Sequence, residues 1–239
     1  HVQARPPPFE TSLKTSITNW VLMTTYGVHH MYLPPAFEIK DRDAMHAIIR
    51  ENNFGALFNQ VDGAPFATHL PFMIEGDFLV AHMARANPQW QAFTEGGPVL
   101  CIFQGPHAYI SPTWYDSANM VPTWNYVAVH VRGTPRIIDD PTRAYATLQR
   151  LVELQEIRLP NPWQLDDQDR ENINVLLRSI VVFEIPIEQI DGKAKMNQNR
   201  TEADRRGAIA GLQDTGGAGN TAVAELMAEF MNRQDPEKE

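Results

Sequence analysis

The feature that most constrains the fold of this chain is a succession of short β-forming runs separated by turn residues. The runs are rich in aromatic and β-branched residues, and Asp-Gly, Gly-Asp and Gly-Pro pairs stand between them. Asp62-Gly63 is a strong signal for a two-residue hairpin, which joins antiparallel strands. The predicted strands are residues 54–61, 66–74, 78–83, 99–104, 107–111, 124–138 and 179–187. Short strands in hairpin order predict an antiparallel β-barrel, so we expect a mostly β fold with added helices (α+β).

The longest predicted strand, residues 124–138, alternates between two kinds of side chain. Val127, Val129 and Val131 fall on one face, because residues two apart in a strand point the same way. Polar and aromatic residues occupy the other face until Gly133 interrupts the pattern. This strand therefore predicts a sheet with one apolar face and one polar face.

Helical spacing of apolar residues occurs at three places within the β-rich region. Residues 41–52 have Asp41 as an N-cap, and residues 142–157 and 167–178 form two further amphipathic segments. A last apolar stripe of helical spacing consists of Val223, Leu226, Met227, Phe230 and Met231. That stripe requires a surface on which the final helix docks.

Composition divides the chain into three segments. Residues 1–30 contain the extended Arg5-Pro6-Pro7-Pro8 and no sustained period, so we expect an N-terminal extension or a remnant upstream of the natural start. Residues 31–214 form the predicted β-rich domain. Residues 215–239 hold a Gly-rich linker, at 215–219, and the C-terminal helix.

Charge and cysteine content narrow the function classes. The chain has 20 Lys and Arg against 29 Asp and Glu, a formal net charge of −9 that repels nucleic-acid phosphates. The compact basic segment is residues 193–206.

The single cysteine, Cys101, lies in an apolar run and cannot form an internal disulfide, so we expect a buried thiol and a cytoplasmic protein. No apolar run approaches the roughly 18 residues of a membrane helix.

Several common catalytic patterns are missing from the sequence. It has no Gly-x-Ser-x-Gly elbow, P-loop or dinucleotide fingerprint, so hydrolase, NTPase and Rossmann interpretations lack their minimal parts. His69, His82, His107 and His130 are separated by 13, 25 and 23 residues, without the short spacing of metal ligands. We therefore predict no metal site.

A strand end that runs into a helix start is the first candidate site. Residues 82–90 carry Arg85 beside Asn87-Pro88, a pair that commonly opens a helix. Free backbone N–H groups at a helix start, together with a guanidinium, suit a phosphate group. The alternative is an ordinary helix entry with Arg85 as a surface charge, and this stretch alone leaves both open.

Aromatic side chains mark the second candidate site. Trp124 and Tyr126 share a strand face and can wall a flat ligand, while Asn125 points the other way. Residues 105–115 add further aromatic residues and prolines. The alternative for residues 105–115 is a strand whose aromatic residues belong to a protein core or a subunit interface.

Cations that alternate with amides mark the third candidate site, residues 193–200. Its members include Lys195, Gln198, Asn199 and Arg200. Amides pair with the C=O and N–H groups of a heterocycle, and a cation stabilises negative charge that builds on a ring. The alternative is a solvated polar loop.

Together these stretches resemble the PaiB family of FMN-binding split-barrel proteins, named for a negative regulator of protease synthesis and sporulation. The resemblance extends from about Met31 to Arg206 and does not include residues 1–30. It rests on Met31-Tyr32 with Pro34, on Thr68-His69-Leu70-Pro71-Phe72, and on residues 82–90, 105–115, 121–126 and 193–200. One departure is Asn197, where the family usually has serine, so a hydroxyl contact is in doubt there.

The resemblance implies an antiparallel split β-barrel that forms a homodimer, with FMN in a cleft between the subunits. Thr68, His69 and Leu70 would lie along the flavin. The phosphate would be approached by His82, Met83, Ala84, Arg85 and Asn87. The pocket would be closed by Trp124, Asn125, Tyr126, Lys195, Gln198, Asn199 and Arg200, from the same subunit or from its partner.

The family name implies transcriptional regulation, and two other functions remain open. The acidic charge and the absence of a recognisable helix-turn-helix favour an indirect effect on transcription, through a partner or through the flavin state, and leave direct DNA binding open. A flavin-dependent oxidoreductase that uses NAD(P)H or another small donor is the main alternative, with His107 or His130 as a candidate proton donor. A split barrel that has lost flavin and binds haem, or no ligand, is the third.

Overall fold

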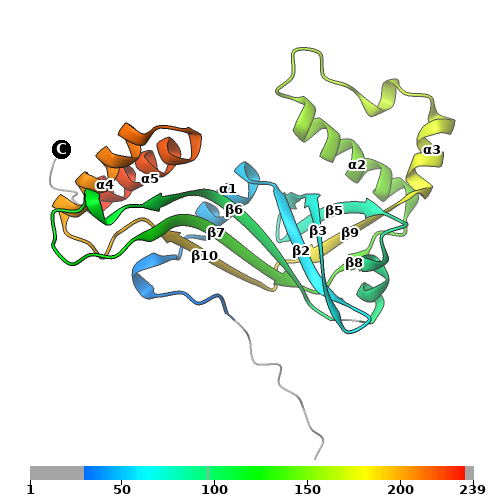
Figure 1. The fold of residues 1–239 in the computed structure, drawn as a ribbon. Helices are drawn as coiled ribbons and strands as arrows, with labels where there is room; N and C mark the ends of the chain where they lie inside the picture. Colours follow the sequence, from blue (N-terminus) through cyan, green and yellow to red (C-terminus); the bar gives the residue numbers. More distant parts are fainter. Residues whose placement is uncertain (1–29, 96, 235–239) are drawn as a thin grey trace, which may run out of the picture.

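The computed structural model describes residues 30–95 and 97–234, which form two antiparallel sheets with helices around them (Figure 1). The larger sheet has the strand order β1-β10-β7-β6-β2-β3, and the smaller sheet has the order β4-β5-β9-β8. The strands are β1 (Glu38–Ile39), β2 (Phe54–Val61), β3 (Ala64–Pro71), β4 (Met73–Glu75), β5 (Phe78–Ala84), β6 (Val99–Ile110), β7 (Thr123–Gly133), β8 (Arg136–Ile137), β9 (Ile180–Pro186) and β10 (Gln189–Lys195). The helices are α1 (Arg42–Glu51), α2 (Pro141–Glu156), α3 (Arg170–Arg178), α4 (Glu202–Thr215) and α5 (Ala218–Gln234), with short 3-10 helices η1 (Pro35–Phe37), η2 (Pro88–Glu95), η3 (Pro112–Trp114) and η4 (Leu165–Asp167).

One hydrophobic core joins the two sheets into a barrel. Leu57 and Val131 of the larger sheet are buried in the same cluster as Leu79 and Phe183 of the smaller sheet. Helix α1 contributes Ile49 to this core, and its N-cap is the Asp41 that the sequence predicts. The expectation of an antiparallel barrel with added helices is confirmed.

A second core lies where the β6–β7 hairpin extends beyond the barrel. There Ile110 and Val127 pack against Leu212 of α4 and Met227 of α5. Figure 1 shows both helices lying over this end of the hairpin. Gly216, with φ of 70°, lets the chain turn between α4 and α5. The apolar stripe of the last helix therefore docks on the hairpin.

Strand β6 is continuous where the sequence predicts two strands. The expected turn at Gly105-Pro106 is wrong, because β6 pairs with β7 on both sides of it. The pairing shifts register between Gln104 and His107, which is a β-bulge that accommodates one extra residue. A proline is tolerated at such a bulge because no ladder hydrogen bond is required of it.

Two other predicted strands are each divided in the structure. Residues 124–138 become β7 and β8, which separate just after Gly133, where a Cβ would lie 1.8 Å from the backbone oxygen of Pro186. Residues 66–74 become β3 and β4, and between them the N–H of Phe72 donates to the carbonyl of Asn53 at 2.8 Å. Each break lies beside a contact with a distant segment.

The polar segment at residues 193–206 is mostly regular structure. Strand β10 pairs with β7 along its whole length, and α4 begins immediately after the turn that follows β10. The hydroxyl oxygen of Thr201 caps α4 by accepting from the N–H of Asp204. Neither element is among those expected from the sequence, which left residues 193–200 as a candidate site or a solvated polar loop.

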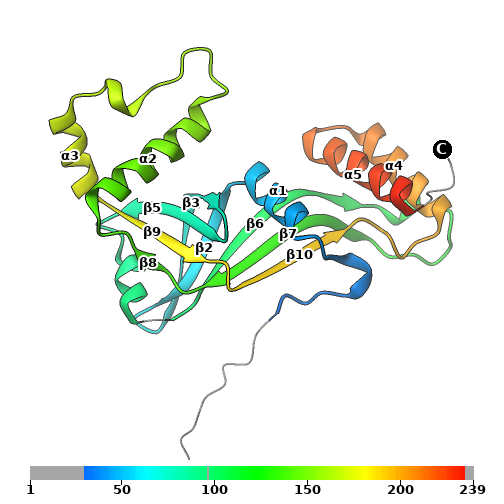
Figure 2. The same cartoon turned by 180° about the vertical axis from the view of Figure 1, so that it is seen from behind.

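A helical arm, residues 141–178, lies between β8 and β9. It consists of α2, η4, α3 and the chain that joins them, and it stands on the same side of the sheets as α1, α4 and α5 (Figures 1 and 2). An ion pair between Arg143 and Glu184 and another between Arg150 and Glu75 at 2.9 Å hold its base to the smaller sheet. Both helices lie where the apolar spacing predicts them.

Candidate functional site

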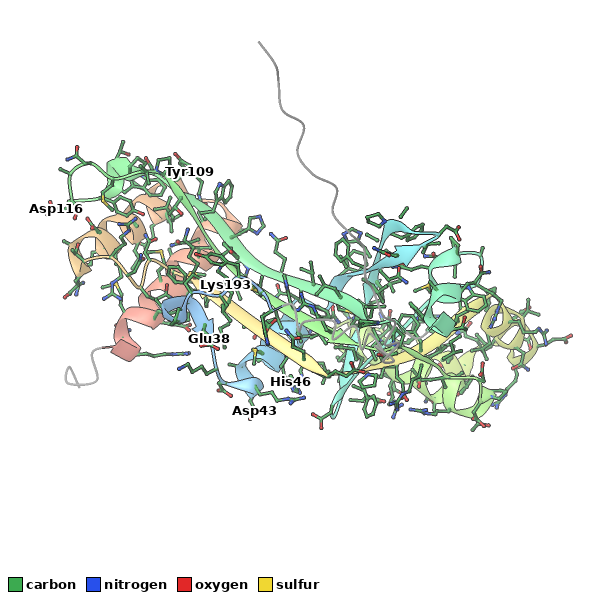
Figure 3. The ribbon with its side chains drawn as sticks, turned by 90° about the horizontal axis from the view of Figure 1, so that it is seen from below. Glu38, Asp43, His46, Tyr109, Asp116 and Lys193 are labelled. Carbon is green, nitrogen blue, oxygen red and sulfur yellow. The ribbon has the colours of Figure 1, made fainter. Side chains whose placement is uncertain are left out.

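The candidate site lies on the face of the larger sheet that α1, α4 and α5 do not cover, which we call the outer face. Directly opposed residues of neighbouring strands point to the same side of a sheet. The ladders align His69 of β3, Ala56 of β2, Ile102 of β6, His130 of β7 and Asp191 of β10. Figure 3 views the molecule from this side, with Tyr109 toward the hairpin end and Lys193 nearer the middle.

Four rings form what we call the aromatic platform, at the hairpin end of the outer face: His107, Tyr109, Trp124 and Tyr126. The Trp124 ring centroid is 5.9 Å from that of Tyr109, in an edge-to-face arrangement, and 6.2 Å from that of His107. Trp124 is 54% exposed and Tyr109 is 45% exposed. The platform therefore presents open ring surface, as a flat ligand requires.

Two lysines of β10 stand beside the platform. Lys195 opposes Tyr126 in the ladder, and its ammonium group donates to the hydroxyl of Thr123. Burial lowers the pKa of Lys195, and the nearby charges of Lys193 and Arg200 lower it further. This part of the outer face therefore concentrates positive charge next to aromatic rings.

Residues 30–37, which end with η1, cross β10 as a strap. Asp191 accepts from the N–H of Met31 at 3.1 Å, and it also pairs with the ring Nδ1 of His30 at 3.1 Å. Lys193 donates to the carbonyl of Tyr32 at 3.0 Å and lies 5.2 Å from the centre of that ring. Burial would raise the pKa of Asp191, but its hydrogen bonds from the strap and from Gln189 lower it. The sequence analysis did not identify Asp191, although its alternation with Lys193 along one strand face was the available signal.

Strand β3 forms the opposite end of the outer face, and we call its neighbourhood the barrel-end cluster. Within the described chain only β2 pairs with β3, so one edge of its backbone remains open for a ligand. His69 is exposed and stacks on Phe54 at 6.1 Å, whereas Leu70 is buried in the core. Thr68 accepts from the amide of Asn87 at 2.9 Å, which joins β3 to the start of η2.

The other residues of the barrel-end cluster lie at the end of β5 and just after it. Met83 is buried in the shared core, while His82 points to the opposite face of the smaller sheet. Beyond Ala84, the guanidinium of Arg85 donates to the carbonyls of Arg178 at 2.9 Å and Ile180 at 2.7 Å. Arg85 is exposed, and the other N–H groups of its five donors remain available to a phosphate.

The turn after β10 uses its amides for its own structure. Gln198 accepts from the N–H of Met196 at 2.7 Å and donates to the carbonyl of Ala194. Arg200 lies 5.8 Å from the ring centre of Tyr115, and Asn199 is exposed. Of these residues, Asn199 presents the most open side chain.

Asn125 lies on the side of β7 away from the platform. It is fully buried beneath α5, where its amide donates to the sulfur of Met227 at 3.3 Å. This agrees with the alternation of the strand, in which Asn125 points away from Trp124. The structure does not bring Asn125 to the outer face with its neighbours.

Within one chain the barrel-end cluster and the aromatic platform are far apart. Thr68 is level with Cys101 of β6 through the ladders, and Trp124 is level with Tyr109 of the same strand. Eight residues of strand at about 3.3 Å each give a separation of about 25 Å. The sequence-predicted site residues therefore form two groups.

The residues present fit a flavin. The platform offers ring faces, Lys195 offers positive charge beside them, and Arg85 offers donors for a phosphate. Buried Nδ1 atoms of His82 and His130 also lack a hydrogen-bond partner among the described residues, so each can bond a ligand or water. Burial lowers the pKa of both imidazoles, which favours their neutral forms.

The described residues supply neither a metal site nor a membrane span. Among residues 30–95 and 97–234, no three His, Cys, Asp or Glu side chains gather where an ion would be held. Every helix in the same part of the chain is too short or too polar to cross a bilayer.

Comparison with known proteins gives the family. Residues 31–189 match the family described as "Putative FMN-binding domain". The chain is 36% identical over 208 residues to Protease synthase and sporulation protein PAI 2 of Bacillus subtilis (strain 168), a match covering 85% of this chain and 100% of that protein. An uncharacterised protein of Emericella nidulans is 27% identical, over 86% of this chain and 99% of its own length.

Solved structures share the fold. The FAD and heme binding protein of Mycobacterium smegmatis superposes with a TM-score of 0.54 at 17% identity, covering 76% of this chain and 80% of that one. A flavocytochrome of Azotobacter vinelandii gives a TM-score of 0.51 at 18% identity, covering 71% and 75%. The architecture is thus an antiparallel split barrel of the flavin-binding type. Taken with the match of the family domain, these findings mean that the chain belongs to the PaiB family of FMN-binding split-barrel proteins and that its cofactor is FMN.

Proposed function

We propose that this protein binds FMN between two copies of itself, with the barrel-end cluster of one copy facing the aromatic platform of the other. The observation that carries the proposal is the separation of about 25 Å between these two groups along one chain. A two-fold dimer that pairs the outer faces in opposite directions brings each group to the partner's complementary group. Each flavin site is then incomplete in a single chain.

Within this dimer the two groups have different tasks. Trp124 and Tyr126 stack on the flavin ring, and Lys195 stabilises negative charge on that ring. The phosphate is held by Arg85 and by the backbone near Asn87, at the start of η2. FMN supplies the capacity for electron transfer, while these side chains bind and orient it and exclude water from its ring.

The proposal includes a regulatory role that acts through the flavin or a protein partner. A chain with a net charge of −9 has little affinity for DNA unless its cations are gathered, and the outer-face lysines are committed to the strap and the platform. The proposed role belongs to the cytoplasm, a reducing compartment that suits the free, buried thiol of Cys101. A gel-shift titration that shows tight, sequence-selective DNA binding would contradict the indirect role.

Mixed dimers test the shared site. Arg85→Ala and Trp124→Ala each damage both sites of a homodimer, but a dimer with one copy of each variant has one site without either change. Random exchange of subunits leaves about a quarter of all sites intact. Flavin retention should therefore rise when the two variants are mixed. A mixture that retains only the average of the separate variants would mean that each flavin is held by a single chain.

An oxidoreductase activity is the second candidate, favoured by the neutral His130 on the outer face. Its buried, unpartnered Nδ1 can exchange a proton with a substrate beside the ring. Anaerobic mixing of the holoprotein with NADH or NADPH separates this candidate from a purely regulatory flavin. Loss of the yellow absorbance at a useful rate supports the enzyme, and a stable spectrum excludes these donors.

A further inference from the structure

The helical arm carries an unusual share of exposed apolar surface. Eleven large hydrophobic side chains are exposed in the described chain, and six of these belong to residues 141–178. Ile157 is 78% exposed and Trp163 is 43% exposed. The six are Leu154, Ile157, Leu159, Trp163, Val175 and Leu176. Ile157 and Trp163 line one groove, and exposed apolar surface that gathers in this way marks an interaction site.

A groove of about 330 Å³ runs along the arm, between α2 and the chain that leads into η4. Ile157, Trp163 and Leu165 supply apolar walls, and Glu153 and Glu156 line it from α2. The groove is held in shape by hydrogen bonds, because Asp166 accepts from Tyr145 at 2.5 Å and from Gln149 at 3.2 Å. The N–H of Trp163 donates to Glu156 at 2.8 Å. These hydrogen bonds mean that the groove is an ordered feature of the surface.

The charge of the groove has one sign. Its lining includes the carboxyl groups of Glu153, Glu156 and Asp166 and no Lys or Arg. The carboxylate of Glu153 makes no hydrogen bond or ion pair with the residues of the described chain. An apolar floor with carboxylates at its edge complements a segment that combines large apolar residues with Lys or Arg.

A second copy of this chain is a poor occupant. The arm stands on the side of α1, α4 and α5, opposite the outer face on which the proposed dimer forms (Figures 1 and 2). A second copy would also bring a net charge of −9 to an acidic groove. The dimer therefore leaves the arm open for a different molecule.

We propose that this groove binds a basic amphipathic segment of another protein. A large apolar side chain of that segment inserts between Ile157 and Trp163, and its Lys or Arg residues face Glu153 and Glu156. The surface lies on the arm and shares no residue with the aromatic platform or the barrel-end cluster. The groove itself does not depend on the way in which FMN is bound, whereas the exclusion of a second copy as its occupant rests in part on the proposed dimer.

Fluorescence anisotropy of a labelled peptide tests the groove. The probe is a short synthetic amphipathic helix of Leu and Lys, titrated with flavin-loaded protein at low salt. Trp163→Ala and Glu153→Lys should each weaken binding about tenfold, the first by removing an aromatic anchor and the second by reversing a charge. Glu225→Lys makes the same charge change on α5 and should leave the affinity unchanged.

A further variant and control peptides separate loss of binding in the groove from loss of folding or of dimerisation. Ile157→Ser, at a side chain that supports no core, should weaken binding without lowering the unfolding temperature. Equal affinity in Glu153→Lys and Glu225→Lys, or equal binding of a Leu and Glu peptide, would overturn the proposal. A fall in oligomeric mass of Ile157→Ser during sedimentation would also overturn it, because the occupant would then be a second copy. Flavin absorbance during each titration shows whether the FMN site has been disturbed.

Discussion

Replacing Trp124 with alanine gives the most direct measure of the aromatic platform. This side chain is 54% exposed, so about 135 Å² of a Trp side chain of up to ~250 Å² remains open. A flavin stacked on one ring face covers about half of that area, or about 70 Å². At ~25 cal/mol per Å² the lost burial is about 1.7 kcal/mol, which corresponds to a roughly 20-fold weaker affinity for FMN.

The assay is titration of the apoprotein with FMN, followed by the quenching of flavin fluorescence. Trp124→Phe serves as the conservative control and should retain most of the affinity, because it keeps an aromatic face. The unfolding temperature of each apoprotein should change little, since about half of the Trp124 surface is exposed and its ring contacts, Tyr109 and His107, are exposed as well. An unchanged FMN affinity would refute stacking at this position, and a variant that unfolds would assign the ring to the protein core.

Two further predictions concern the fold that supports the site. Gly207→Ala should lower the free energy of unfolding by about 1–3 kcal/mol in denaturant titrations, because the new Cβ would lie 2.0 Å from the backbone oxygen of Trp114. Gly219→Ala, whose Cβ would meet its nearest atom at 3.3 Å, is the matched control and should be much better tolerated. The second prediction concerns acid stability, because burial lowers the pKa of His82 from its ordinary value of 6.5. As the pH falls, His82 takes up a proton at a higher pH in the unfolded chain than in the folded chain. The contribution of neutral His82 to the free energy of unfolding is therefore complete above pH 6.5, and it is lost as the pH falls toward the pKa of the folded state. Between pH 7 and pH 5 the free energy of unfolding should therefore fall less steeply in His82→Leu than in the unchanged protein, by up to about 1.4 kcal/mol per pH unit. An equal fall in both proteins would contradict this assignment.

Local signals in the sequence predicted much of the barrel. Residues 54–61 form β2 with the predicted bounds, and the Asp62-Gly63 turn has positive φ at both positions, 51° and 76°. Asp41 caps α1 as expected, with its carboxylate accepting from the N–H of Asp43. Each of these features depends on a few adjacent residues, so the local sequence is sufficient to predict it.

Features that depend on distant contacts were not predictable. The sequence marked Gly133 as the point where the strand is interrupted, but no neighbour of Gly133 in the sequence reports the approach of Pro186, whose oxygen would lie 1.8 Å from a Cβ at that position. α4 was missed because Gly207 and Gly211 weaken its helical pattern. Both glycines are required by Trp114, whose backbone oxygen and ring lie 2.0 Å and 2.3 Å from the two Cβ positions.

In the candidate site, too, the local features were predictable and those that depend on distant contacts were not. Alternation along β7 correctly separated Trp124 and Tyr126 from Asn125, which the structure buries under α5. The sequence contained no measure of the distance from Thr68 to Trp124, which requires the register of the intervening strands. It also left the strap unassigned, since the contacts of His30 and Met31 with Asp191 span about 160 residues.

The bulge in β6 determines which residues each half of the strand presents. Before the shift, even-numbered residues such as Leu100 and Ile102 face outward, and after it the odd-numbered His107 and Tyr109 do so. If residues 105 and 106 both paired regularly with β7, without the bulge, the distal half would be inverted, exposing Ala108 and Ile110 and driving two polar rings against α5. The one extra residue of the bulge thus changes which side chains of the strand face outward. It lets one uninterrupted strand line the barrel at one end and present aromatic rings at the other.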